Sequence, residues 1–263
     1  MEITTRNLFR LLRAGVLGRH ETVEPMSAWK WERTYHLAMV HGLEAETWKG
    51  ITLLQQQFFM RLTDKLRTQW EKSALTASHA HTTPIPSRLS KKLDRLEEAS
   101  PHTADSSFSV LRAMVVLSQS LLTADRWVRQ LLSLAAMLST DGLRIDREQL
   151  EKWVKELHME RMTQLEGVLL TRLVDIREER LPFKMTLNEE ERSQMLEEIV
   201  ATIDATTHQW QFSQGGNIFV HNSSSSAMYW QARHSVRYLK YHPTASIASF
   251  VSSFVQSLTN IEE

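Results

Sequence analysis

The sequence predicts an all-α fold, a multi-helix bundle of about eight to ten helices with one small irregular or β-hairpin element near residues 208–222. Apolar residues recur at intervals of three and four along most of the 263 residues, as they do on the buried face of a helix. The chain has only 8 Gly and 6 Pro, which favours long helices over a sheet with many tight turns. Hydrophobic residues make up 42% of the chain, and at this length they can form a substantial core.

Residues 1–77 form an N-terminal helical region in this prediction. The first helix carries apolar residues at helical spacing over residues 8–16, has a basic outer face and ends near Gly18. Ser27 is a typical N-cap for a second helix, which Gly42 ends. A third, longer helix is expected over residues 43–75.

Residues 78–107 differ in composition from the segments on either side. They are rich in Ser, Thr, Pro and His around the charged stretch RLSKKLDRLEE, so we expect a linker with one short, solvated helix. His79 and His81 lie in this linker without an acidic neighbour, so we predict loop histidines and no metal site. The linker separates residues 1–77 from a second helical region, 108–263, and we expect the two regions to form one compact domain.

The C-terminal region begins with two helices that are broken near Thr123. Asp146 is a typical N-cap for the next helix, and Gln149 can complete a capping box with it. A further helix is expected from about residue 160 to 178, where a proline follows. Asn188 can cap the helix after that, whose first turn is acidic and therefore suits the positive end of the helix dipole.

The segment 208–222 is the one region without a helical pattern. Trp210 and Phe212 are separated from the apolar run 218–220 by Gly215 and Gly216, which predicts a small hairpin or an ordered loop. Two more helices are expected to close the chain.

Charge and composition restrict the classes of partner. Lys and Arg number 31 and Asp and Glu number 31, so no overall field attracts nucleic acid or an acidic membrane. No stretch approaches 18 consecutive apolar residues, and arginines interrupt the N-terminal apolar segment, which argues against a membrane span and a secretory signal. The chain has no Cys, which fits a reducing compartment. We therefore expect a cytoplasmic protein whose partner is another protein or a second copy of itself.

No motif predicts a catalytic residue, a cofactor or a metal. The chain has no G-x-S-x-G elbow, P-loop or G-x-G-x-x-G turn, and capping explains its Asp-x-Glu at residues 146–148. The eight Trp fit a helical core better than a stacking surface. We expect burial of Trp29, Trp31, Trp48, Trp127 and Trp153.

Two short stretches supply the candidate binding residues. In DRWVRQLLSLAAML, the polar pair Arg129 and Gln130 follows Trp127 within an apolar helix, so the pair either serves a site or ties the helix into the bundle. A basic and aromatic run near the C-terminus is the second stretch. Its residues are Arg233, Arg237 and Tyr238.

Three sequence blocks together resemble a known family. The first block contains LFRLLRAGVLG and HLAMVHGL, and the second runs from DRWVRQLLSLAAML to LVDIREERLPF. The third block contains NEEERSQMLEEIV, GGNIF and RYLKYHP. In this order they resemble a family of uncharacterised bacterial nucleotidyltransferases, in which helical flanks surround a polymerase-beta-type catalytic core. In that family the core, with its Lys-Gly loop and Gly-Asp-Ile-Asp strand, lies between the first two blocks. Here that interval holds only the linker, so the resemblance implies flanks without the core.

The resemblance also bears on single residues. Arg129 and Gln130 match the family's Arg-Gln, which borders the catalytic core, whereas Ser133 and Leu134 stand where the family usually has Asp-Trp. No catalytic residue can be transferred. We therefore expect Arg129 to bind helix-end carbonyls or a carboxylate, while Trp127 packs inward.

The resemblance implies a non-catalytic, nucleotidyltransferase-like protein that serves as an interaction or scaffold module. Two alternatives remain open: an accessory subunit that supplies substrate-binding helices to a nucleotidyltransferase in trans, and a helical domain that binds a small molecule.

Overall fold

The structure is a computed structural model that describes residues 1–57, 62–77, 83–100, 105–123, 126–140 and 144–213. These residues form ten α-helices and one short 3-10 helix, and none of them lies in a strand. The predicted all-α class and the predicted number of helices are confirmed.

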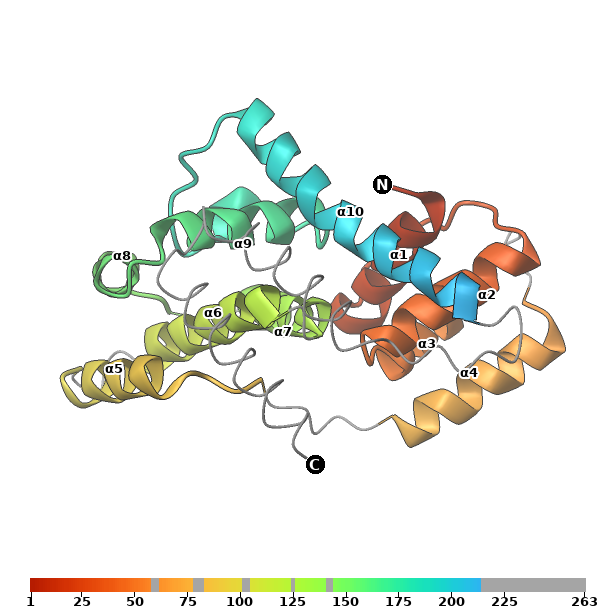
Figure 1. Cartoon of the computed structure of the whole chain (residues 1–263), viewed down its shortest axis with the longest axis horizontal. Coiled ribbons are helices and arrows are strands. Elements are labelled where there is room, and N and C mark those ends of the chain that lie inside the picture. Colours follow the sequence, from red (N-terminus) through yellow and green to blue (C-terminus); the bar gives the residue numbers. More distant parts are fainter. Residues whose placement is uncertain (58–61, 78–82, 101–104, 124–125, 141–143, 214–263) are drawn as a thin grey trace.

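The helices fall into two groups that α1 and α7 connect (Figure 1). The first group contains α1 (Ile3–Leu17), α2 (Ala28–Val40), α3 (Glu44–Leu54) and α4 (Asp64–Thr76). The second contains α5 (Ser87–Glu98), α6 (Asp105–Thr123), α7 (Trp127–Ser139), α8 (Arg147–Glu156), α9 (Glu160–Arg172) and the 3-10 helix η2 (Glu178–Arg180). The last helix, α10 (Glu189–Ser213), packs on α9 and reaches α2, so it lies across both groups.

Side-chain caps start three helices where the sequence predicts them. Ser27, Asp146 and Asn188 each accept a hydrogen bond from the backbone N–H three residues further on, at 3.4, 2.9 and 2.9 Å. Each cap satisfies one of the N–H groups that the first turn of a helix leaves without a partner.

The predicted capping box at α8 is wrong in one detail. The backbone N–H of Asp146 donates to the hydroxyl of Ser107 at 2.8 Å, and Gln149 is not its acceptor. A residue 39 positions away in the sequence thus takes the place of the local partner. The reciprocal bond of a capping box does form at α10, where the Asn188 N–H donates to Glu191 at 3.0 Å.

The single helix predicted over residues 43–75 is two helices, α3 and α4. Thr63 begins the second by accepting from the N–H of Leu66 at 3.3 Å. Just after α3, Gln57 accepts from the N–H of Val23 at 2.9 Å and donates to the carbonyl of Glu21. These tertiary bonds hold the end of α3 against the loop that follows α1, and helical periodicity carries no signal for them.

The helix predicted to reach residue 178 ends at Arg172. Beyond it, the carbonyls of Leu173 and Asp175 accept hydrogen bonds from Arg13 at 2.9 Å and Arg19 at 2.6 Å. Arginine side chains that are distant in the sequence therefore bind the carbonyls just after the helix end. This happens before Pro182, the residue at which the sequence predicts that the helix stops.

The predicted hairpin near residues 208–222 is wrong over residues 208–213, because α10 continues through them to Ser213. From residue 189 to 214 the sequence has neither Gly nor Pro, so nothing in the backbone chemistry ends the helix earlier. Residues 214–222 and the two predicted closing helices lie outside the described residues, as do His79 and His81 of the linker.

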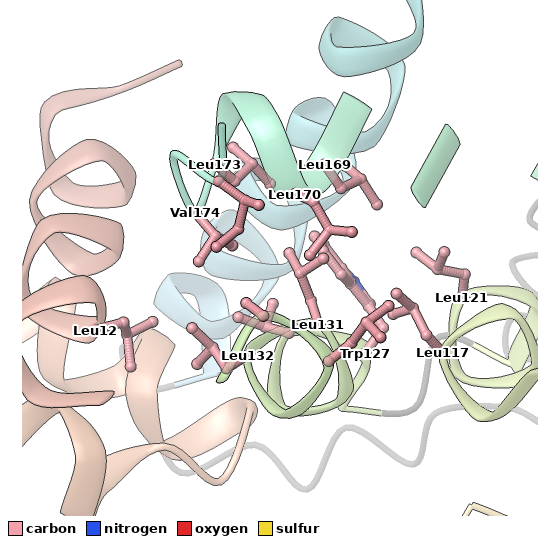
Figure 2. Packing of buried hydrophobic residues seen from close by; sticks show 14 of the residues in the cluster. Leu12, Leu117, Leu121, Trp127, Leu131, Leu132, Leu169, Leu170, Leu173 and Val174 are labelled. Carbon is pink, nitrogen blue, oxygen red and sulfur yellow. The ribbon is translucent and has the colours of Figure 1, made fainter. Parts of the chain in front are cut away.

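One continuous hydrophobic cluster extends from α1 to α10. Figure 2 shows its centre, where Leu12 of α1 points toward Leu132 of α7 while Leu131 and Trp127 turn toward α9 and α6. The linker helix α5 joins the cluster through Leu93 and Leu96, so one face of this helix is packed and not solvated.

The helix α6 contains an 18-residue window, Ser106–Thr123, that could cross a membrane by length and mean hydropathy alone. However, 67% of this window is buried inside the protein. Most of α6 therefore packs inside the helical core.

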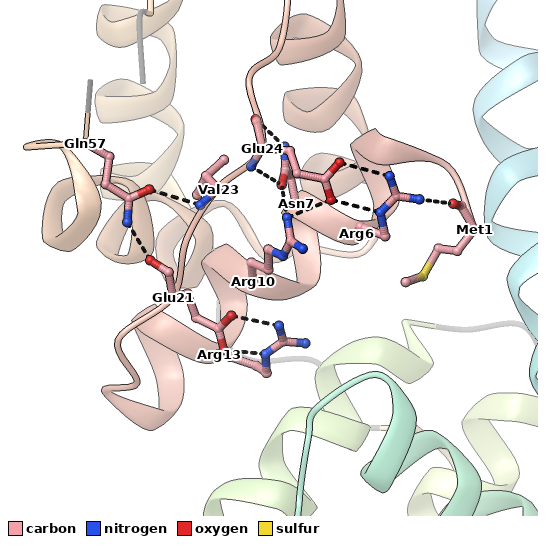
Figure 3. Close-up of polar contacts among 9 residues, drawn as sticks. All are labelled: Met1, Arg6, Asn7, Arg10, Arg13, Glu21, Val23, Glu24 and Gln57. Carbon is pink, nitrogen blue, oxygen red and sulfur yellow. Dashed lines mark hydrogen bonds and ion pairs between the residues drawn. The ribbon is translucent and has the colours of Figure 1, made fainter. Parts of the chain in front are cut away.

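The basic face predicted for the first helix is engaged by the loop that follows it (Figure 3). Arg6 binds the Glu24 carboxylate at 3.0 and 2.9 Å, and Arg10 binds it at 2.7 Å. Arg13 binds Glu21 through two further bonds. The hydrogen bonds from Arg6 lower the pKa of the Glu24 carboxyl. These arginines hold the loop in place, so they are not simply a solvated face.

The prediction of buried tryptophans is correct for three of five. Trp31, Trp127 and Trp153 are buried and Trp48 is partly buried. Trp29 is 53% exposed, and the guanidinium of Arg33 lies 5.7 Å from the centre of its ring. Trp29 lies in the first turn of α2, where its ring is exposed to solvent and forms a cation–π contact with Arg33 one turn later.

Candidate functional site

The helix α7 carries three of the predicted binding residues on two different faces. Its apolar positions, which include Trp127 and Leu131, are buried in the core. Arg129 and Gln130 lie on the side that faces α1 and α3, together with Ser133 one turn later. Each residue turns the helix by about 100°, so Arg129, two positions after Trp127, lies on the opposite side of α7.

A pocket of about 340 Å³ lies between the N-terminal helices and α7. Its apolar lining comes from Val16, Leu43, Leu132 and Ala136. Its polar lining comes from Glu46, Arg129, Gln130 and Ser133. The pocket thus lies at the junction of the two helix groups, and Arg129 and Gln130 meet there.

An ion pair forms the charged part of the pocket wall. The Nη1 of Arg129 donates to Oε1 of Glu46 at 2.9 Å, and Nη2 donates to Oε2 at 3.3 Å. The side chains are 14% and 23% exposed, so solvent screens this pair less than a surface pair but still reaches it. The expectation that Arg129 binds a carboxylate is confirmed.

The position of Glu46 depends on a close approach of α1 and α3 at two glycines. A Cβ atom on Gly15 would lie 2.8 Å from the backbone nitrogen of Gly50 and closer still to the carbonyl oxygen of Glu46. A Cβ atom on Gly50 would lie 2.7 Å from the carbonyl carbon of Leu11. Only glycine permits this separation of the two backbones, which fixes the first turn of α3 and with it the carboxylate that faces Arg129.

Charges of both signs surround the pocket. Burial raises the pKa of the Glu44 carboxyl, while the positive charges of Arg129 and Arg126 act in the opposite direction. Arg126 has a left-handed backbone, with φ of 46°, and its guanidinium packs on Gly42. Neither sign dominates this end of α7.

Trp127 is not part of the pocket lining. Its indole is 5% exposed and meets the ring of His41 edge-on, with 6.3 Å between ring centroids and 73° between planes. Burial lowers the pKa of His41 to about 4, so the imidazole is neutral at physiological pH. The indole and the imidazole anchor the start of α7 on the end of α2, which is a structural contact.

The remaining candidates, Arg233, Arg237 and Tyr238, lie outside the described residues. Within the described residues, the sequence missed Glu46 as the partner of Arg129. Its position in the first turn of α3 is already explained by the helix dipole, and no local pattern links residues 83 positions apart.

A second acidic residue was also missed, in the core and away from the pocket. The carboxyl of Glu166 is fully buried and accepts a hydrogen bond from the hydroxyl of Ser118 at 2.7 Å. Burial raises the pKa of Glu166 well above its usual value, and the hydrogen bond from Ser118 offsets this only in part. Its position on the buried stripe of α9 is the one sequence signal that could have indicated it.

No family model, curated protein or solved structure matches this chain. The resemblance to nucleotidyltransferases therefore stays a prediction from the sequence blocks.

Proposed function

We propose that this protein is a non-catalytic, nucleotidyltransferase-like interaction module that binds a partner at the junction of α1, α3 and α7. The observation that supports this proposal is the pocket at that junction. In the family that the sequence resembles, the Arg-Gln element borders the catalytic core. Here the matching residues, Arg129 and Gln130, border an open pocket between the two helix groups.

The chemistry of the pocket favours binding over nucleotidyl transfer. Two-metal transfer uses several carboxylates to hold the metal ions, which in turn bind the triphosphate. Among the described residues that line the pocket there is a single carboxylate, that of Glu46, and the guanidinium of Arg129 binds it. An amide, a hydroxyl and a paired charge are groups that orient a bound molecule. The proposal includes a cytoplasmic setting, because a chain without Cys fits a reducing compartment.

Site-specific photo-crosslinking in cells tests this proposal. Ser133 is exposed at the pocket, and Glu190 is exposed at the start of α10, so a small aliphatic diazirine residue at each position gives a matched pair that leaves the pocket open. We expect one adduct of defined mass from position 133 and none from position 190. A second substitution, Arg129→Gln, should reduce the adduct at least fivefold. Equal adducts at both positions would contradict the proposal.

Nucleotide binding provides an independent test. Any ligand that binds the native state raises its thermal stability. We expect no change in the unfolding temperature with ATP or CTP and Mg²⁺. A concentration-dependent rise would favour an enzyme or an enzyme subunit over a non-catalytic module.

A helical domain that binds a small molecule is the second candidate function. The volume of the pocket favours it, because about 340 Å³ lies at the lower end of the roughly 300–1,000 Å³ that ligand sites span.

A further inference from the structure

We propose that the pocket binds a small zwitterion with an aliphatic body, of the chemical class of a free α-amino acid. The inference rests on the second candidate function, a helical domain that binds a small molecule in this pocket, and names the class of that ligand. It is argued from the charge, the lining and the size of the pocket.

The ion pair in the wall favours a ligand that carries both charges. An anion would have to compete with Glu46 for Arg129 and would leave a partly buried carboxylate without its cation. A cation would compete with Arg129 for Glu46 in the same way. A zwitterion avoids both costs, because its carboxylate can lie beside the guanidinium and its ammonium beside the carboxylate while the pair stays intact.

Two neutral side chains add directional groups beside the ion pair. Gln130 supplies amide donors and an acceptor, and Ser133 supplies a hydroxyl. Within the part of the chain that the structure describes, neither side chain forms a hydrogen bond, and neither is buried. They are therefore available to orient a polar ligand head next to Arg129.

The rest of the described lining suits an aliphatic body. Val16, Leu43, Leu132 and Ala136 contribute apolar side chains, so an alkyl group that contacts them leaves water for an apolar surface. Polar and apolar side chains that line one space of about 340 Å³ fit a molecule with a charged head and a short alkyl chain. The ion pair lies within this space and is mostly buried, so a small molecule reaches it more readily than a flat protein surface does.

Three compounds separate the charges of such a ligand. L-leucine carries both charges, 4-methylpentanoate keeps its carboxylate and carbon skeleton, and 3-methylbutylamine keeps its ammonium and branched chain. Calorimetric and saturation-transfer NMR titrations of the full chain should detect binding of L-leucine. We expect each singly charged analogue to bind at least tenfold more weakly. L-valine and L-methionine extend the panel to other aliphatic bodies.

Variants locate the binding in the pocket. Ser133→Trp fills the pocket from an exposed position without altering the ion pair, and it should abolish binding. Arg129→Gln should weaken L-leucine at least tenfold. The control is Arg192→Gln, because Arg192 binds Glu178 at 2.7 and 3.3 Å in a geometry close to that of the pocket pair but outside the pocket. This control should bind L-leucine as the wild type does.

Each outcome decides one proposal. Equal binding of 4-methylpentanoate and L-leucine, or L-leucine binding that survives Ser133→Trp, overturns the zwitterion inference. If none of the three amino acids binds while crosslinking at position 133 still gives its specific adduct, the ligand class is wrong and the proposed function stands. If both binding and crosslinking fail, the proposed function is wrong as well.

Discussion

The crossing of α1 and α3 provides the sharpest test of the fold, through the substitution Gly50→Ala. The new Cβ would lie 2.7 Å from the carbonyl carbon of Leu11 and 3.0 Å from its Cα, and closer still to its carbonyl oxygen. Ordinary van der Waals contact begins at 3.4 Å, so the carbonyl carbon alone requires the helices to separate by about 0.7 Å, and the carbonyl oxygen requires a larger separation. A gap of roughly 0.5–1 Å already removes a quarter to a half of the dispersion energy of each atom pair that it opens.

The expected cost follows from which atoms collide. Overpacking a core costs typically about 1–3 kcal/mol, and backbone atoms of Leu11 cannot rotate away, so we expect the upper end of this range. Replacing Gly by Ala inside a helix returns roughly 1 kcal/mol of helix propensity. The free energy of unfolding should therefore fall by about 2 kcal/mol. For a chain of this length the midpoint of thermal unfolding should fall by roughly 4–8 °C.

Gly167→Ala is a matched control, because Gly167 is also buried inside a helix. Its new Cβ would meet the sulfur of Met185, and it would lie 3.0 Å from a ring carbon of Phe183. Since a methionine side chain adapts easily, we expect a change within about 1 kcal/mol. Urea unfolding followed by circular dichroism measures both variants. If Gly50→Ala is as stable as the wild type, or less destabilised than Gly167→Ala, the close approach of α1 and α3 is wrong.

Three further predictions concern polar residues. Burial raises the pKa of Glu166 in the folded state, so the unfolded state loses this proton first as pH rises, and the stability of the wild type falls above about pH 4.5. Glu166→Gln should remove this pH dependence of stability, which urea titrations at pH 5 and 8 measure. His41 acts oppositely: its pKa of about 4 in the folded state lies below 6.5, so stability falls as pH drops from about 6.5 toward 4, by roughly 3 kcal/mol in total. His41→Phe keeps a ring against Trp127 and should abolish this loss, whereas an unchanged slope would refute the burial of a neutral imidazole. A double-mutant cycle on Arg129 and Glu46 with alanine should give a coupling energy of roughly 1–2 kcal/mol, and a value near zero would mean that the pair does not hold α7 to α3.

The local features of the fold were predictable from the sequence. The caps at Ser27, Asp146 and Asn188 and the break after Thr123 depend on residues within a few positions of one another. Such features are encoded where they occur, so composition and periodicity suffice to predict an all-α protein with about the observed number of helices.

Three of the errors, those at the end of α3, at the end of α9 and at the cap of α8, share one physical cause. Gln57 binds the loop at residues 21–23, Arg13 and Arg19 bind carbonyls beyond α9, and Ser107 takes the backbone N–H of Asp146. In each case a donor or acceptor from a distant segment takes a role that the sequence assigns to a local residue. Hydrogen bonds of this kind leave no periodic signal.

The candidate site shows the same division. The sequence alone determined that Arg129 and Gln130 interrupt an apolar helix and that Arg129 needs an acceptor. Only the tertiary structure decided that the acceptor is Glu46, because Gly15 and Gly50 let two backbones approach closely enough to bring the first turn of α3 to α7. Helical periodicity specifies which face of each helix is buried, whereas the distance and the partner across a helix crossing depend on how side chains from separate segments pack.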